Sequence, residues 1–340
     1  MNKKVKKDIA VQDDKRERRN PPAPITEPVL SLILCAVAFA ICLIMLVLDR
    51  FVFPIGDELL APVIAQLITL VLPAYLVILL TYRERSAFLQ MKKIGFCKLR
   101  AKYIFFIIFS ALFAVCLSLM LTLSFGGSYD ASGGFTLLGI FTAGENEFSV
   151  SAPYLIVVYA VVPAMTEEFF FRGVIFSQLK EVSFPFAALI SSLLFALSGF
   201  SLGGLIPMFF FGIMLVFVFY TTSSLWACAI VHFLFNLYKL FLEANVAAYF
   251  LSSTNTALLI ITLSLALLIS ALLFFSESAR IYRARAEKIA KGSETSASEF
   301  VNVRSVGKEL RSALAYKPSL VSSLICLALF VAAVIINYIV

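Results

Sequence analysis

Histidine is almost absent from this chain of 340 residues, which contains a single one, His232. A lone histidine argues against a zinc centre, because catalytic zinc sites usually take three protein ligands and are rich in nitrogen. The six cysteines never form a CxxC pair and lie mostly inside apolar runs, so we interpret them as buried small side chains. The sequence therefore predicts no metal and no other cofactor.

Charged residues are scarce as well, at 14% of the sequence, whereas 61% of the residues are hydrophobic and the mean hydropathy is +0.96. About a quarter of the residues of a soluble domain are charged, so the bilayer is the expected solvent. Apolar runs of about 20 residues predict membrane-spanning helices, and the alternating pattern that barrels need is absent. Nine spans are expected: 28–49, 58–81, 103–125, 152–179, 184–201, 204–222, 225–249, 256–276 and 319–339.

Positive charge is missing from the loop 126–151. By contrast, 24 of the 28 lysines and arginines lie in residues 1–27, 82–102 and 277–318, which share one side of a nine-span topology. The positive-inside rule then predicts a cytoplasmic N-terminus and a C-terminus outside the cell. The net charge of +7 is explained by basic residues that flank the spans, where they set the topology and contact membrane lipids. No nucleic-acid reader motif accompanies it, so nucleic acid is not an expected partner.

The chain divides into four parts by composition. Residues 1–27 form a basic tail that we expect to be disordered, and 28–276 form the polytopic membrane domain. A basic, flexible connector, 277–318, begins with a helical extension of the eighth span and leads to a C-terminal transmembrane helix, 319–340. The expected fold is thus an all-α polytopic membrane protein, with about eight helices in one bundle and a ninth appended. The N-terminus has no cleavable signal, and no internal repeat favours an inverted-repeat transporter.

The fourth span contains two adjacent carboxylates in the stretch VVPAMTEEFFFRG, residues 161–173. Ionisable residues inside a membrane are costly and indicate function. Glu168 and Arg172 are four residues apart, so they can pair on one helix face. Glu167 points about 100° away, and burial favours its protonated form unless another helix supplies hydrogen bonds or water. Such a carboxylate can act as a general base, or it can be a protonated side chain that braces the bundle.

The seventh span contains the single histidine in the stretch ACAIVHFLFNLYK. His232 and Asn236 lie one turn apart on the same face, where they could donate hydrogen bonds to an oxyanion. The alternative is a histidine that is hydrogen-bonded and serves only packing. Lys239 and Glu243 form a further i,i+4 pair towards the outer half of the span. The estimated depth of Glu167 in the fourth span overlaps that of His232 and Asn236 in the seventh, within the uncertainty of the span ends. This overlap predicts one shared site, open towards the cytoplasm.

At these residues the sequence resembles the CAAX prenyl protease and bacteriocin-processing family, also called Abi proteins. The first motif of that family, EExxxR, stands here as Glu167-Glu168-Phe-Phe-Phe-Arg172. The third motif, HxxxN, stands as His232-Phe-Leu-Phe-Asn236. Two short motifs in the family's order, within spans of one bundle, are more specific than either motif alone.

The second motif, FxxxH, matches only in part. Phe195 is present in the stretch SSLLFALSGFS, whereas Gly199 stands where the resemblance leads us to expect a histidine. The resemblance covers roughly residues 100–250. It implies a bacterial cytoplasmic membrane and substrates such as prenylated CAAX ends or bacterial peptides.

The resemblance also implies a role for each matching residue. Glu167 would deprotonate a water with help from the histidine of the second motif. His232 and Asn236 would stabilise the tetrahedral oxyanion, while Glu168 and Arg172 would brace the site.

Three hypotheses for function remain from the sequence. It favours a family member that is catalytically impaired and acts as a membrane scaffold or regulator of a partner membrane protein, because losing one acid–base partner commonly costs about 10²–10⁴ in rate. The alternative is an active intramembrane glutamate endopeptidase that cleaves a peptide substrate. A proton-coupled transporter is the third, supported only by the charges inside the membrane.

Overall fold

The computed structural model of the chain describes residues 27–51, 60–81, 94–124, 152–180, 183–242, 256–290 and 317–339. Every regular element in these ranges is helical. In chain order they are α2 (Glu27–Phe51), α3 (Leu60–Gln66), η1 (Leu67–Val71), α4 (Leu72–Thr81), η2 (Ala101–Tyr103), α6 (Ile104–Ser124), α7 (Ala152–Ile156), η3 (Val157–Val161), α8 (Val162–Glu168), η4 (Phe169–Phe176), α9 (Ser177–Leu179), α10 (Phe184–Leu197), α11 (Leu205–Thr222), α12 (Leu225–Phe241), α14 (Thr256–Ala290) and α16 (Lys317–Ile339). Two rods, from α3 to α4 and from α7 to α9, are continuous helices assembled from several of these elements.

Within the described ranges, six helices are long and apolar enough to cross a membrane: Val29–Leu48, Pro62–Leu79, Ala101–Leu121, Pro153–Leu179, Leu205–Thr222 and Ile260–Ala284. Three shorter apolar helices are Phe184–Leu197, Leu225–Phe241 and Leu320–Ile336. Together they coincide with the nine spans predicted from the sequence, which confirms an all-α polytopic membrane protein. The predictions for residues 1–26 of the tail, for residues 291–316 of the connector and for Glu243 concern residues outside the described ranges.

Three helix ends differ from the prediction. α12 ends at Phe241, eight residues before the predicted end at 249, and Leu242, which follows it, has φ −116°, far from the helical value of about −63°. α14 continues to Ala290, beyond the predicted span end at 276, as expected for a connector that begins as a helical extension. α10 ends at Leu197, four residues before the predicted end at 201. The physical reason is a tight turn in which Phe200 adopts φ +47°, a left-handed conformation that cannot continue a right-handed helix.

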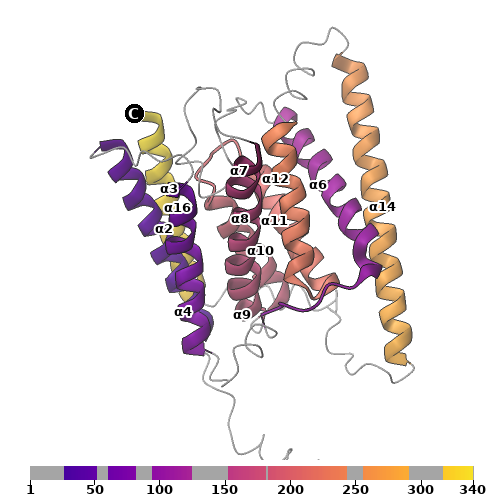
Figure 1. The fold of residues 1–340 in the computed structure, drawn as a ribbon, viewed down its shortest axis with the longest axis horizontal. Coiled ribbons are helices and arrows are strands. Elements are labelled where there is room, and N and C mark those ends of the chain that lie inside the picture. Colours follow the sequence, from indigo (N-terminus) through magenta and orange to yellow (C-terminus); the bar gives the residue numbers. More distant parts are fainter. Residues whose placement is uncertain are drawn as a thin grey trace, which may run out of the picture.

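The helices stand roughly parallel in one bundle (Figure 1). α2, α16 and the α3–α4 rod form one flank, α6 and α14 form the other, and α7 to α12 lie between them. The ninth helix is not isolated, because α16 packs along α2 and also contacts α10. α12 packs against both α8 and α6, so it joins the centre of the bundle to the α6–α14 flank.

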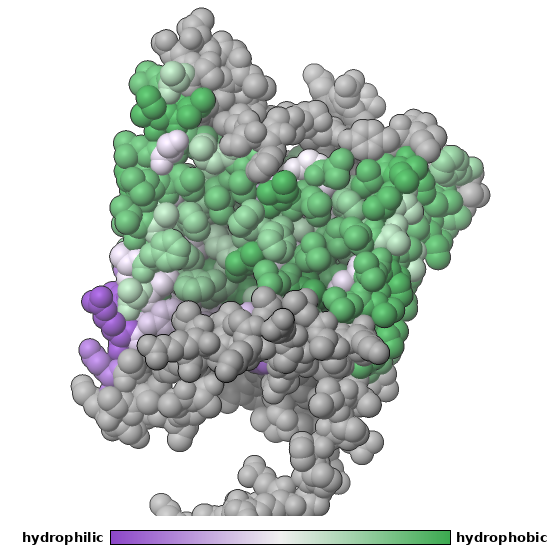
Figure 2. Space-filling view, turned by 180° about the vertical axis from the view of Figure 1, so that it is seen from behind, coloured by the Kyte–Doolittle hydropathy of each residue, from purple (hydrophilic) through white to green (hydrophobic). Residues whose placement is uncertain are grey.

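The outward faces of the bundle are apolar. Figure 2 shows a broad hydrophobic band across the back of the molecule. Ile261 and Leu272 of α14 are 62% and 61% exposed. Exposure of such apolar side chains costs free energy in water but not in lipid. Inside, aromatic rings fill the space between helices, for example Phe211 stacked on Phe235 with ring centroids 4.1 Å apart. The apolar exterior fits a bundle whose surrounding solvent is hydrocarbon.

Wide π-helical turns precede two prolines inside the spans. η1 ends two residues before Pro73, and η3 ends two residues before Pro163. Proline has no N–H for the carbonyl four residues earlier, and its ring crowds that carbonyl, so the helix widens locally. The third π-helical segment, η4, contains no proline and begins directly after Glu168. Such turns occur often at functional sites, and here α8 contacts all three.

Gly212 allows α10 and α11 to approach closely. A Cβ atom at this position would lie 3.0 Å from both Cα and Cβ of Ser192 and 3.3 Å from the ring of Phe195. Small residues at such crossings bring helix backbones together in membranes. Gly212 therefore determines how near α11 lies to the face of α10 that carries Phe195.

We expect Gly212→Val to destabilise the fold by about 1–3 kcal/mol, because the added side chain must push the two helices apart. Gly203→Val is the control, since a Cβ there meets no atom within 4 Å. Unfolding of the purified protein in mixed detergent micelles measures both changes. Equal costs for the two substitutions would contradict this account of the α10–α11 contact.

Candidate active site

Glu168 and Arg172 form a buried ion pair one turn apart on the α8–η4 rod. Arg172 Nη1 donates to Glu168 Oε1 at 2.9 Å, as the spacing predicted. Arg172 Nη2 donates to the carbonyl oxygen of Gly212 at 3.2 Å, and the guanidinium carbon lies 4.2 Å from the centre of the Phe195 ring. A carboxylate, a carbonyl and an aromatic face thus stabilise the arginine, whose side chain is fully buried.

His232 of α12 reaches the same carboxylate oxygen. Its Nδ1 lies 2.9 Å from Glu168 Oε1, which confirms that the fourth and seventh spans meet at these residues. Phe195 and Phe211 contact the imidazole with ring centroids 5.6 and 5.3 Å away, both nearly perpendicular to it. The Glu168 carboxylate that pairs with Arg172 can only accept hydrogen bonds. We therefore assign the proton of a neutral His232 to Nδ1, the nitrogen that faces this carboxylate. Nε2 then carries a lone pair.

Another helix supplies a hydrogen bond to Glu167. Gln66, the last residue of α3, donates from Nε2 to Glu167 Oε1 at 3.4 Å and accepts from Thr166 Oγ1 at 2.6 Å. Gln66 and Glu167 are both fully buried. Gln66 and Thr166 were not among the site residues predicted from the sequence. The sequence did contain one signal for Gln66: an amide side chain inside the apolar second span needs a hydrogen-bond partner.

The second oxygen of Glu167 faces the free nitrogen of His232. Glu167 Oε2 and His232 Nε2 are 3.8 Å apart, and each is buried without a hydrogen-bond partner. Asn236 Nδ2, one helical turn further along α12, is also buried without a partner. A distance of 3.8 Å is too long for a direct hydrogen bond, whereas buried polar atoms normally have a partner, so both atoms are available to accept from a third group.

The second-motif residues lie in different surroundings. Phe195 of α10 contacts both Arg172 and His232, so it belongs to the site. Gly199 lies in the turn after α10, where a Cβ would meet only the carbonyl oxygen of Ala196, at 3.6 Å. Larger side chains at position 199 therefore meet no steric obstacle at Cβ. Since His232 is the single histidine of the chain, it is also the single imidazole of the site.

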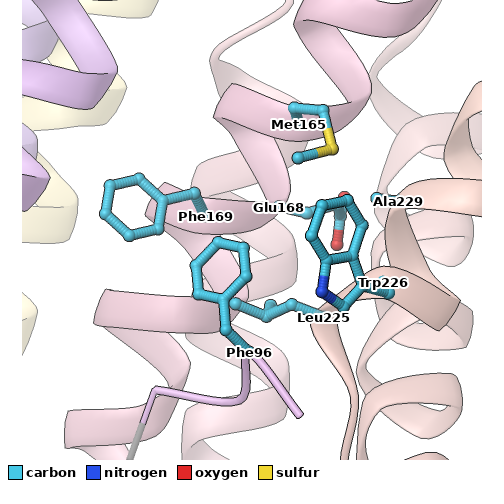
Figure 3. Close-up of a pocket in the computed structure, with 7 residues that line it drawn as sticks. All are labelled: Phe96, Met165, Glu168, Phe169, Leu225, Trp226 and Ala229. Carbon is cyan, nitrogen blue, oxygen red and sulfur yellow. The ribbon is translucent and has the colours of Figure 1, made fainter. Parts of the chain in front are cut away.

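A small cavity approaches Glu168 between α8, α12 and the segment 94–100 (Figure 3). Its volume is about 10 Å³, close to the minimum for one water molecule. Figure 3 shows the Glu168 carboxyl behind the ring of Trp226, with the rings of Phe96 and Phe169 beside it. The lining residues are Phe96, Met165, Glu168, Phe169, Leu225, Trp226 and Ala229. Across the described ranges, no group of three or more His, Cys, Asp or Glu side chains is arranged to hold a metal ion.

The fold is that of a helical polytopic membrane protein with a buried cluster of two glutamates, an arginine and a histidine, and it is consistent with the CAAX-protease type. Residues 149–238 match the family described as type II CAAX prenyl endopeptidase, Rce1-like. This match confirms the resemblance predicted from the motifs. The matched segment contains every residue singled out by that resemblance: Glu167, Glu168, Arg172, Phe195, Gly199, His232 and Asn236. Comparison with curated proteins and with solved structures gives no match.

We expect Arg172→Met to destabilise the protein by about 3–5 kcal/mol, because it leaves Glu168 buried without its counter-ion. The double variant Arg172→Met with Glu168→Gln should cost less than the sum of the two single changes, since it removes both charges. Arg280→Met is the control, because that arginine is 57% exposed in its pair with Glu277 and should contribute less than about 1 kcal/mol. Strict additivity in detergent unfolding would refute the coupling.

We expect Thr166→Val to cost about 1–3 kcal/mol, because it removes the hydroxyl that donates to the buried oxygen of Gln66. Thr166→Ser keeps this hydroxyl and should cost clearly less. Unfolding in detergent compares the two variants. If serine costs as much as valine, the methyl group of Thr166, rather than its hydrogen bond to α3, stabilises this contact.

Proposed function

We propose that the chain is an intramembrane endopeptidase of the Rce1-like type, in which Glu167 and His232 together hold the hydrolytic water. The observation that carries this proposal is the 3.8 Å separation of Glu167 Oε2 and His232 Nε2, two buried atoms without partners. Gly199 removes the histidine that the family resemblance assigns to this task. The geometry supports His232 as its replacement.

The proposed step follows from the acceptors on each side of the water. The water donates one hydrogen to the Glu167 carboxylate and the other to His232 Nε2, so an oxygen lone pair points away from both. As its oxygen attacks the peptide carbonyl carbon, Glu167 takes one proton. The tetrahedral intermediate collapses with cleavage of the C–N bond, and the leaving amine receives the proton from Glu167. Gln66 keeps the first oxygen of Glu167 in place throughout.

Asn236 is the oxyanion donor in this scheme. A neutral His232 that donates from Nδ1 to Glu168 has no hydrogen on Nε2, so it cannot also donate to an oxyanion. The amide nitrogen of Asn236 carries two hydrogens and has no partner in the described structure. This division differs from the roles implied by the resemblance, in which both residues stabilise the oxyanion.

Substrate access requires movement, because Glu167 and His232 are fully buried. The proposed route lies between α8 and α12, beside Phe96 and Trp226, where the small cavity already approaches Glu168. The distribution of lysine and arginine supports a cytoplasmic N-terminus and an outer C-terminus in a bacterial cytoplasmic membrane. The segment 94–100 would then lie on the cytoplasmic side. The expected substrate is the C-terminal region of a membrane-attached, prenylated protein, or a hydrophobic peptide.

A second candidate is a catalytically impaired scaffold or regulator of a partner membrane protein. The observations that favour it are Gly199 at the histidine position and the closed state of the site. In that case the buried polar cluster stabilises the bundle, and the surfaces around it bind the partner.

One experiment distinguishes the two candidates. Purified protein in liposomes is incubated with prenylated CAAX peptides and hydrophobic peptides, and cleavage is followed by mass spectrometry. We expect the wild type to cleave and both Glu167→Gln and His232→Gln to lose about 10²–10⁴ in rate. Glu277→Gln, a carboxylate outside the site, is the control and should leave the rate unchanged.

Gly199→His decides between the remaining outcomes. Cleavage by this variant alone would support the impaired scaffold, because a restored imidazole would be required. Cleavage by the wild type that persists in His232→Gln would refute the shared water. Absence of cleavage in every variant, with peptides that another Rce1-like enzyme cuts, would refute the proposed peptidase for that substrate class.

A further inference from the structure

A cluster of exposed basic side chains lies at one end of the α6–α14 flank. We call it the basic rim, and its members are Lys98, Arg100, Lys102, Arg280 and Arg283. The first three precede or lie within η2, and the last two lie on α14. Arg280 Nη2 donates to the carbonyl oxygen of Lys102 at 3.5 Å, which brings together segments 178 residues apart in the chain. None of its members lines the cavity beside Glu168, although Phe96 of the segment 94–100 does.

Most of these charges have no acidic partner. Arg280 is the exception, because its Nε and Nη2 both donate to Glu277 Oε2. Among the residues that the structure describes, no carboxylate pairs with Lys98, Arg100, Lys102 or Arg283, although Glu287 lies on α14 one turn beyond Arg283. The ammonium of Lys102 lies 4.9 Å from the Tyr103 ring centre, and that residue is exposed. A net positive surface therefore faces outward.

The basic rim lies at the edge of the apolar band. On α14, Leu272 and Phe275 are 61% and 58% exposed, and Arg280 follows five residues later, a rise of about 7.5 Å. Figure 2 shows hydrophilic side chains at the lower left edge of the hydrophobic band, where this end of α14 lies. Tyr282, whose hydroxyl is 3.1 Å from Thr221 Oγ1, lies at the same level. Tyrosine is typical of the boundary between acyl chains and headgroups.

We infer that the basic rim binds the phosphodiester headgroup of an anionic phospholipid. Lys102 and Arg283 supply charge for the phosphate, while Leu272 and Phe275 offer an apolar surface to the acyl chains below it. A soluble anion would use only the first of these features. The charge complementarity and the position at the band edge together favour a lipid.

Binding of lipid to the intact protein tests this inference. The protein in nanodiscs of phosphatidylcholine with graded phosphatidylglycerol is analysed by native mass spectrometry, which counts retained lipids of each kind. We expect retention of phosphatidylglycerol over phosphatidylcholine, and a loss of about fivefold in its affinity for each of Lys102→Ala and Arg283→Ala, the equivalent of about 1 kcal/mol per charge. Arg280→Ala should have a smaller effect, because Glu277 already pairs with that arginine.

Lys180→Ala is the matched control, since this exposed lysine follows α9 and lies outside the basic rim. An equal loss in this variant would overturn the inference, because general surface charge would then explain the binding. Equal retention of both lipids in the wild type would also overturn it. If inorganic phosphate displaces phosphatidylglycerol and binds without it, the site is one for a soluble anion and the lipid assignment is wrong.

Discussion

The structure of the site depends on the Glu168 carboxylate, a charge held in a bundle whose surroundings are hydrocarbon. Its Oε1 atom accepts from Arg172 and from His232, so one atom joins the α8–η4 rod to α12. Arg172 extends the link to α11 through the carbonyl of Gly212. Apolar residues of similar volume could stabilise such a bundle as well as a buried ion pair does. An ion pair buried among membrane-spanning helices is therefore the kind of feature that motivates a functional hypothesis.

The environment of Glu167 depends on the helix geometry around two prolines. The wide turns before Pro73 and Pro163 change the direction in which neighbouring side chains point, and η1 packs against α8, the element that directly follows η3. At this junction Gln66 meets Thr166 and Glu167. A regular helix advances each side chain by 100°, so an undisturbed pair of helices would present different faces there. The prolines thus contribute to the site although neither is polar.

The sequence was sufficient for the parts of the structure that depend on local rules. Hydropathy predicted the nine spans, and the four-residue spacing predicted the pairing of Glu168 with Arg172. It was not sufficient for Gln66 or for the two contacts of His232, because the rotation of each helix about its axis depends on packing against its neighbours. The early end of α10 has the same origin, since the Phe200 ring lies between Phe39 and Phe330 of other helices.

On the proposed mechanism, Gly199 slows the enzyme through the oxyanion rather than through the base. An imidazole does lie beside Glu167, because His232 Nε2 is 3.8 Å away, yet this nitrogen cannot accept from the water and donate to the oxyanion at once. Asn236 is then the remaining donor on α12, and the loss of one oxyanion donor costs about 10²–10³ in rate. A second imidazole near Glu167 would hold the water, so that a His232 protonated on both nitrogens could donate from Nε2 to the oxyanion. On this proposal, the difference between an impaired site and a slow one is a difference in how many tasks one histidine performs.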